Sequence, residues 1–397
     1  SRLINAEGRR IRATRPSPAR ETAAVYLTAR FAFERDVFGT GFAIEGIFFF
    51  TEAIFIAIYI YGWKRIAGWR HFWTGVPIVI AGIGGAFSVV AVNSWMNQPQ
   101  GFELDSRGNV VDVEPLNALF NPATVYEFPH MLLAAYMVVG FGLASVYAIG
   151  MLRHPRRRTD HRHRLGLLIP LTVAAILTPI QLYVGDIAAR GVADDQPAKF
   201  AAMECVYETG PNQTEWIGGI CTDDEVKYGI GIPGLDSFLV GFSTDTVVTG
   251  LDQIPDDEEP PAHTLLHLAF DTMVGIGTAL LGLAAWFAFV WWRRRDIPET
   301  RWFLRAVGVS GVASVIALEA GWIVTEVGRQ PWIVYENMRV SEAVTSAGGL
   351  WFVFAGAIVL YCSIGFIAYL ALKRVARGTS GGGELPYSPP APAGKGA

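Results

Sequence analysis

The chain reads LRAVGVSGVASVIALEAGWIVTEV over residues 304–327 and continues as GRQPW over residues 328–332. The first part is an apolar run longer than the roughly 20 residues that a helix needs to cross a bilayer. A carboxylate such as Glu319 is costly inside such a helix and is usually retained for function. Pro331 then stops the helix, and Trp332 suits a membrane interface. The stretch predicts a membrane helix that buries a functional acid.

Composition extends this prediction to the whole chain of 397 residues, of which 51% are hydrophobic and only 17% are charged, with a mean hydropathy of +0.32. A soluble chain would carry more charge and shorter apolar runs. Backbone groups in lipid must be satisfied within each segment, so the apolar runs are helices. We therefore expect an all-α integral membrane protein, a polytopic bundle of about seven helices. The expected spans are 41–62, 72–95, 126–151, 165–185, 263–292, 304–327 and 347–372.

The basic residues predict the orientation of these helices. They gather in four short segments that share one side if the helices alternate: 64–70, 153–164, 293–301 and 373–377. Basic loops lie on the cytoplasmic side, so these runs are signals of topology rather than of nucleic-acid binding. The outer loop, residues 186–262, carries sixteen acidic residues against three basic ones. Cys205 and Cys221 lie in this loop, where an oxidising environment permits a disulfide between them.

The ends of the chain differ from its middle. Residues 1–36 carry eight arginines against four acidic residues and no apolar run, and we expect a basic, disordered segment. Four membrane helices then occupy residues 37–185, and three more occupy residues 263–375. Residues 376–397 are rich in Gly, Pro and Ser and predict a flexible tail.

Two side chains are candidate ligands of a low-spin haem. His130 follows Pro129 at the outer end of one helix, and Met273 lies in a helix that also enters from the outer face. Taken singly, such a His is more often an interfacial side chain and such a Met is core filler. A His/Met pair is a familiar axial set for a low-spin haem, in which the thioether raises the reduction potential.

Glu45 and Glu52 are further carboxylates inside an apolar helix. Their spacing of seven residues places them on roughly one face, two turns apart. Without basic partners in the segment they must be neutral, paired across helices, or lining a wet path. Both could simply be protonated and hydrogen-bonded to neighbours, or they could serve a haem and a proton path.

The motifs in combination resemble subunit I of the cytochrome bd quinol oxidases. They are the segment from Glu319 to Trp322 with the GRQPW motif, Ile44-Glu45-Gly46, the stretch from Val92 to Met96, His130, Met273, and the pair Lys199 and Glu204. We interpret the stretch from Asn93 to Pro99, at the end of a helix, as interface packing rather than chemistry. The resemblance covers residues 36–375. It implies a prokaryotic plasma-membrane enzyme that oxidises quinol and reduces O2 to water, with a second membrane subunit, subunit II, as partner.

The resemblance also implies the roles of single residues. His130 and Met273 match the ligands of the low-spin haem b, and Glu319 matches a ligand of a high-spin haem b. Glu45 lies where the family has the oxygen-reducing haem, of d or b type, and Glu52 continues a proton path from it. Arg329 could contact a haem propionate, or it could simply snorkel to the interface.

Lys199 and Glu204 match the family's quinol-oxidising loop, in which a Lys and a Glu five residues later act on the quinol. A carboxylate beside a quinol hydroxyl can accept its proton as the electrons leave. From spacing alone, a solvated charged helix would explain the same residues. The sequence does not distinguish ubiquinol from menaquinol.

The resemblance begins after two helices that the family carries at its amino end. The first of these helices holds a His that ligates a high-spin haem, and in this sequence the first His is His71. A truncated gene, a frameshift or a misassigned start codon would each produce this pattern. The alternative function is therefore a non-oxidase remnant that keeps only the low-spin haem, for electron transfer or assembly.

Overall fold

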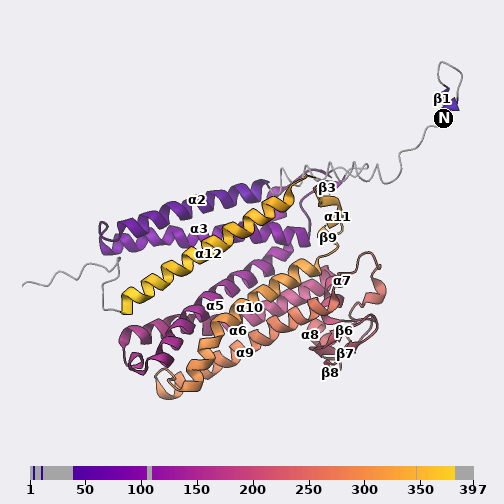
Figure 1. Cartoon of the computed structure of the whole chain (residues 1–397). Helices are drawn as coiled ribbons and strands as arrows, with labels where there is room; N and C mark the ends of the chain where they lie inside the picture. The colour runs from indigo at the N-terminus through magenta and orange to yellow at the C-terminus, as the bar shows by residue number, and fades with distance from the viewer. Residues whose placement is uncertain (1–2, 5–9, 12–38, 105–109, 346, 381–397) are drawn as a thin grey trace, which may run out of the picture. The chain divides into compact units, whose positions relative to one another are not determined.

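The structure is a computed structural model, and it describes residues 3–4, 10–11, 39–104, 110–345 and 347–380 (Figure 1). Within these residues, seven helices are long and apolar enough to cross a membrane, which confirms the predicted all-α membrane fold. The predictions for residues 1–36 fall outside the described residues, except that strand β1 (Leu3–Ile4) pairs with strand β2 (Arg10–Ile11). Residues 381–397 also lie outside them.

The seven long helices are α2 (Gly39–Gly62), α3 (Gly68–Asn97), α5 (Pro122–Arg153), α6 (His161–Asp195), α9 (His263–Arg294), α10 (Arg301–Gly328) and α12 (Leu350–Ser380). All seven contain more residues than the predicted spans, and two of them extend well past the predicted carboxyl end. Helix α6 continues past residue 185 to Asp195, and α12 reaches Ser380, where the sequence predicts a flexible tail from residue 376. Hydropathy detects only the apolar part of a helix, whereas backbone hydrogen bonding continues beyond it.

Side-chain caps define where several helices begin. The Asn121 side chain accepts a hydrogen bond from the Thr124 backbone N–H at 3.0 Å, at the start of α5. The Thr300 hydroxyl accepts one from the Phe303 N–H at the start of α10. Each cap satisfies one of the backbone N–H groups that the first turn of a helix leaves unpaired.

The described chain divides into two compact units. The bundle unit comprises residues 1–42 and 86–343, and the second unit comprises residues 43–85 and 344–397. In the bundle unit, α5 packs against α6 and α10, and α9 also packs against both, so the four helices close a ring. Figure 1 shows these four helices side by side.

The centre of this ring is apolar. Its fully shielded side chains include Phe141, Leu167, Leu171, Phe303 and Leu304. Helices α5 and α6 approach closely at Gly140, where a Cβ would lie 2.9 Å from the Pro170 carbonyl oxygen. Small residues at helix crossings allow this dispersion contact, which stabilises helix pairs in lipid. This packing fixes the helices that carry three of the candidate residues, His130, Met273 and Glu319.

Short elements follow or connect the long helices. Between α6 and α9, the 196–262 loop forms α7 (Pro197–Glu204), β5 (Glu215–Ile217), β6 (Ile220–Cys221), β7 (Val226–Lys227), β8 (Ile230–Ile232), α8 (Leu235–Gly241) and η3 (Leu251–Gln253). Strand β5 pairs with β8, and β6 pairs with β7. The others are β3 (Glu103–Leu104), β4 (Val110–Val111), α4 (Pro115–Leu119), η2 (Pro155–Arg158), β9 (Trp332–Val334), β10 (Met338–Arg339) and α11 (Val340–Ala343).

The second unit contains most of α2, the first part of α3, and α12. Its two α2 and α3 segments pack closely, because Phe48 lies over Gly84, where a Cβ would come within 2.4 Å of the ring. Near the turn between them, the His71 ring stacks on Tyr59 and donates from Nε2 to the Tyr59 carbonyl oxygen at 2.8 Å. His71 is therefore a structural side chain of this turn.

Candidate functional site

His130 lies on α5, half-buried, where α6 passes close to it. A Cβ at Gly185 of α6 would be 3.1 Å from Cε1 of the imidazole. The Gln181 side-chain amide nitrogen is 3.3 Å from both ring nitrogens, and within the described residues no other group hydrogen-bonds to the ring. The Gln181 amide oxygen is buried without a partner. The Gln181 amide thus holds the imidazole, and among the described residues no carboxylate or carbonyl oxygen occupies its ring nitrogens.

Met273 lies on α9, half-buried, and points its sulfur toward α10. A Cβ at Gly321 of α10 would be 3.0 Å from the Met273 sulfur. Each candidate ligand of the low-spin haem therefore faces a glycine on a neighbouring helix of the same ring. Imidazole and thioether are a known axial pair, and at each position the neighbouring helix comes close to the donor where it has no Cβ. The residues present fit a His/Met-ligated haem.

Glu319 does not have the environment that the sequence predicts. Its side chain is exposed on the surface of α10 rather than buried within the protein. The helix turns its small and apolar residues, such as Ala320 and Val324, toward the ring. A carboxylate on the outer face of a membrane helix needs a cover of its own, which a bound haem would provide.

Glu45 and Glu52 belong to the second unit and are half-buried on α2. Helix α3 passes Glu52 at Gly82, where a Cβ would lie 3.8 Å from the Glu52 Oε1. Helix α3 is therefore close to Glu52 where it has no side chain. This close packing of α3 is compatible with both hypotheses for the two carboxylates, that they are neutral structural groups or that they belong to a proton path.

Lys199 and Glu204 both lie on the short helix α7, and both are buried, with 4% and 3% of their surface exposed. A solvated charged helix is therefore excluded. The GRQPW motif makes room for the lysine, because a Cβ at Gly328 would lie 2.7 Å from Lys199 Cγ. The structure thus brings together two motifs that the sequence separates by more than a hundred residues.

Lys199 has one hydrogen-bonding partner within the described chain, the Asn97 side chain, whose Oδ1 is 3.3 Å from its Nζ. Burial lowers the pKa of Lys199 to about 8, while the Glu127 carboxylate acts in the opposite direction. The Arg329 guanidinium lowers this pKa and Glu326 raises it. The Lys199 ammonium can therefore lose its proton at a mildly alkaline pH.

The residues around Asn97 correct one sequence prediction. The stretch Asn93 to Pro99 predicts interface packing only, yet three of its side chains bind carboxylates. Asn93 donates to Glu326 at 3.0 Å, Ser94 donates to Glu127 at 2.6 Å, and Asn97 donates to Glu127 at 2.9 Å. The signal available was the run of polar residues ending an otherwise apolar helix. Glu127 was likewise not identified, because a lone Glu near a helix end is common.

Arg329 is buried, with 5% exposure, and forms an ion pair with Glu326 through Nη2. Its Nε and Nη1 are buried and have no hydrogen-bond acceptor within the described residues. The snorkelling interpretation is therefore wrong, because the guanidinium is shielded from water. Two unpaired donors on a buried cation fit an anionic ligand such as a haem propionate.

Glu204 lies among other carboxyl groups of the 196–262 loop. Burial, followed by repulsion from Glu215, Asp236 and Asp271, raises its pKa well above the usual range. Burial also raises the pKa of Glu215 to about 8 and that of Asp236 to about 7. Glu204 Oε2 and Asp236 Oδ2 are buried without hydrogen-bond partners in the described chain. Glu215 and Asp236 can therefore exchange protons near neutral pH.

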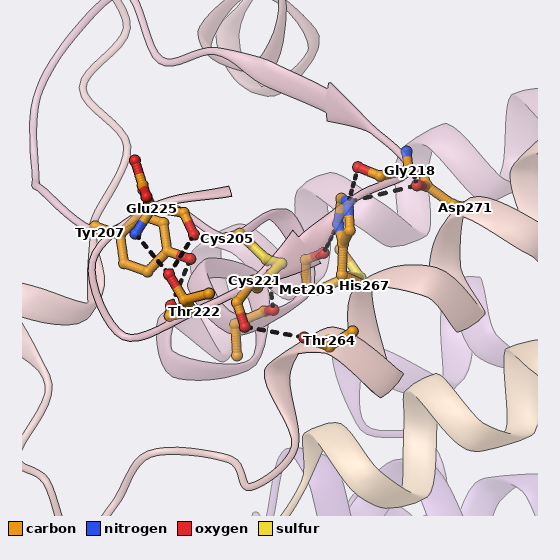
Figure 2. The surroundings of a disulfide bond; sticks show 11 residues. Met203, Cys205, Tyr207, Gly218, Cys221, Thr222, Glu225, Thr264, His267 and Asp271 are labelled. Atoms are coloured by element: carbon orange, nitrogen blue, oxygen red, sulfur yellow. Dashed lines mark hydrogen bonds and ion pairs between the residues drawn. A yellow bond between two sulfur atoms is a disulfide. The ribbon is translucent and has the colours of Figure 1, made fainter. Parts of the chain in front are cut away.

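A disulfide secures this region (Figure 2). The sequence left open whether Cys205 and Cys221 are joined, and the structure joins them. Beside it, the His267 ring contacts the Met203 carbonyl oxygen at 2.9 Å through Nδ1 and the Gly218 carbonyl oxygen at 3.2 Å through Nε2. The two sulfurs and His267 come within 4.8 Å of one another. The sulfurs are bonded together, so they are not the thiolates that a metal site requires.

Comparison with known proteins gives consistent matches. The family model described as cytochrome bd terminal oxidase subunit I matches residues 31–380. The putative cytochrome bd menaquinol oxidase subunit I of Bacillus subtilis (strain 168) is 33% identical over 330 residues, covering 82% of this chain and 73% of that protein. The cytochrome bd-II ubiquinol oxidase subunit 1 of Escherichia coli (strain K12) is 25% identical over 413 residues, covering 86% and 80%.

One solved structure is also similar. It is the structure of bd oxidase from Geobacillus thermodenitrificans, with a TM-score of 0.78 and 34% sequence identity. The alignment covers 89% of this chain and 80% of that chain.

Proposed function

Because the chain belongs to the cytochrome bd terminal oxidase subunit I family, a family of membrane oxidoreductases that contain haem, we propose that it oxidises a membrane quinol and passes the electrons to oxygen. The observation that carries this proposal is the burial of Lys199 and Glu204 on one short helix of the 196–262 loop. Burying two ionisable groups is unfavourable unless they serve each other or a ligand. The relatives' names include both menaquinol and ubiquinol, so the quinol class stays open.

His130 and Met273 would hold a low-spin haem b at the two glycine-lined positions of the helix ring. Glu319 would serve a high-spin haem b, and Glu45 would serve a further haem of d or b type. When bound, these haems carry the electrons and reduce O2 to water. Arg329, with two unpaired donors, would hold a haem propionate, and Glu52 would continue a proton path from Glu45.

Lys199 and Glu204 would act on the quinol itself. Oxidation of a quinol to a quinone releases two electrons and two protons. The Lys199 ammonium can donate a hydrogen bond to a quinol oxygen, and a deprotonated Glu204 can accept a proton from the hydroxyl. Asp236, whose pKa is about 7, is suited to receive protons from this region. We place this loop on the outer face of the plasma membrane and expect subunit II as the membrane partner.

The test is a reduced-minus-oxidised spectrum, with and without carbon monoxide, on membranes that contain this chain and its partner subunit. The proposal expects a low-spin haem b signal and carbon monoxide-sensitive high-spin signals. A low-spin signal alone would support the remnant function instead, and the absence of any haem signal would exclude both.

Quinol kinetics then test the loop. Lys199→Met and Glu204→Gln are expected to raise KM or lower kcat for quinol while the haem spectrum is retained. Glu208→Gln, an exposed carboxylate four residues after Glu204, is the matched control and should behave as wild type. Wild-type kinetics in both loop variants would contradict the assigned roles.

A further inference from the structure

Glu127 lies on α5, one turn before His130, and the sequence assigns it no role. Both of its carboxylate oxygens are bonded by side chains of α3. Ser94 Oγ donates to Oε2 at 2.6 Å, and Asn97 Nδ2 donates to Oε1 at 2.9 Å. The bond from Ser94 is at the short end for an O–H···O hydrogen bond, and the bond from Asn97 has the ordinary N–H···O length. The carboxylate is thus fixed in position rather than free to turn.

The Asn97 amide joins Glu127 to the quinol loop. Its Nδ2 donates to Glu127, while its Oδ1 is 3.3 Å from Lys199 Nζ and accepts from it. An amide can bridge an anion and a cation only in this orientation, because nitrogen donates and oxygen accepts. The Asn97 backbone oxygen also accepts from Gln196 Nε2 at 2.7 Å, next to the start of α7. Asn97 therefore connects α3, α5 and α7 at one point.

Lys199 needs a counter-charge that its own helix does not provide. It is 4% exposed, and the charged groups that act on it come from two other helices. They are Glu127 of α5, which after burial has the largest influence, and Arg329 with Glu326 of α10, which oppose each other. A buried cation that loses its carboxylate is left uncompensated, which is strongly unfavourable.

We propose that Glu127 is a positioning residue for quinol oxidation, which holds the Lys199 ammonium through the Asn97 amide and supplies its counter-charge. The inference rests on the proposed function, because Lys199 must act on the quinol for its position to matter. Glu127 itself does not touch the quinol. Its carboxylate keeps the Lys199 ammonium protonated and orients it through the Asn97 amide.

The pH dependence of quinol oxidation tests this, in membranes that contain the chain and its partner subunit. The probe is a short-chain ubiquinol or menaquinol, whichever the wild type oxidises. Glu127→Gln keeps the shape and one acceptor but removes the charge. Lys199, with a pKa of about 8, then loses its proton at lower pH, so the alkaline limb of the profile should move down by about one pH unit.

Three variants make the result specific. Glu127→Asp retains the charge and should keep the alkaline limb near that of the wild type. Glu225→Gln removes an exposed carboxylate that pairs only with Lys227 among the described residues, and should change nothing. The double variant of Glu127→Gln with Lys199→Met should match Lys199→Met alone, because the two groups act as one.

The outcomes separate this inference from the proposed function. If Lys199→Met oxidises quinol as the wild type does, the proposed function of the loop is wrong. If Lys199→Met loses activity while Glu127→Gln keeps the wild-type profile, only the role of Glu127 is overturned. Should Glu127→Gln assemble no haem, Asn97→Ala decides instead. It breaks the bridge but leaves the carboxylate, and an unchanged KM and alkaline limb in that variant would overturn the inference.

Discussion

The α5–α6–α9–α10 ring and the 196–262 loop both shield side chains, but they shield opposite kinds. The ring encloses apolar groups such as Phe141 and Phe303, whereas the loop encloses Lys199, Glu204 and Asp236. In lipid, the ring gains little from burial itself and depends on close packing between helices. The loop instead keeps ionisable groups away from water at a cost in free energy, and this burial shifts the pKa values of Lys199 and Asp236 to about 8 and about 7.

The largest expected loss of activity follows the replacement of a candidate haem ligand in the helix ring. We expect His130→Ala to abolish the low-spin haem signal and to reduce quinol oxidation below about one hundredth of the wild-type rate. Loss of a group that only supports a metal ligand already lowers metal affinity or activity by about 10- to 100-fold, and loss of the ligand itself should cost more. The difference spectrum of the variant measures this. His154→Ala, an exposed His at the end of the same helix, is the control. A normal low-spin signal in His130→Ala would exclude His130 as the ligand.

Packing should dominate the stability of the ring. Phe141→Ala removes a fully buried ring between the helices and is expected to destabilise the bundle by about 3 to 5 kcal/mol. Thermal unfolding in detergent micelles, followed by loss of the haem spectrum, measures the effect. Val139→Ala on the exposed side of α5 should cost far less. Equal losses in the two variants would show that the ring is not held by its core.

The loop should depend more on its covalent link. Replacing Cys205 and Cys221 by Ser opens a link between residues 16 apart and is expected to destabilise the loop by about 3 kcal/mol. Limited proteolysis should then cut the 205–221 segment faster, while the helix ring stays intact. Cys362→Ser, which changes an exposed free thiol, is the control. Unchanged proteolysis would show that the hydrogen bonds of the loop suffice.

The smallest expected effect concerns pH. Burial raises the pKa of Asp236 from 3.8 to about 7, so the folded loop binds a proton more tightly than the unfolded chain does. The loop should therefore lose stability as pH rises from about 4 to about 7. Asp236→Asn removes the contribution of this group, leaves those of Glu204 and Glu215, and should stabilise the loop by on the order of 1 to 2 kcal/mol at pH 8.

Proteolysis of the loop between pH 4 and pH 8 measures the effect of Asp236→Asn. The matched control is Asp245→Asn, which changes an exposed carboxylate and should leave the pH dependence of proteolysis unchanged. A pH profile identical in Asp236→Asn and wild type would show that another carboxyl group is responsible.

The sequence by itself determined the membrane fold and the position of each span. Transfer of a segment into lipid depends on its own length and hydropathy, so each helix can be found without its neighbours. The family also followed from local motifs, since GRQPW and the Lys199/Glu204 pair each lie within a few residues. The bounds of α6 and α12 could not be found this way, because their ends extend beyond the apolar run.

The environments of single side chains were decided only by the tertiary structure. Glu319 was expected to be buried and is exposed, while the stretch from Asn93 to Pro99 was expected only to pack and also binds Glu127 and Glu326. Asn97 reaches Glu127 and Lys199 across 30 and 102 residues of chain. Whether a charge is paired, solvated or unsatisfied depends on such distant partners, and they meet only when the helices pack.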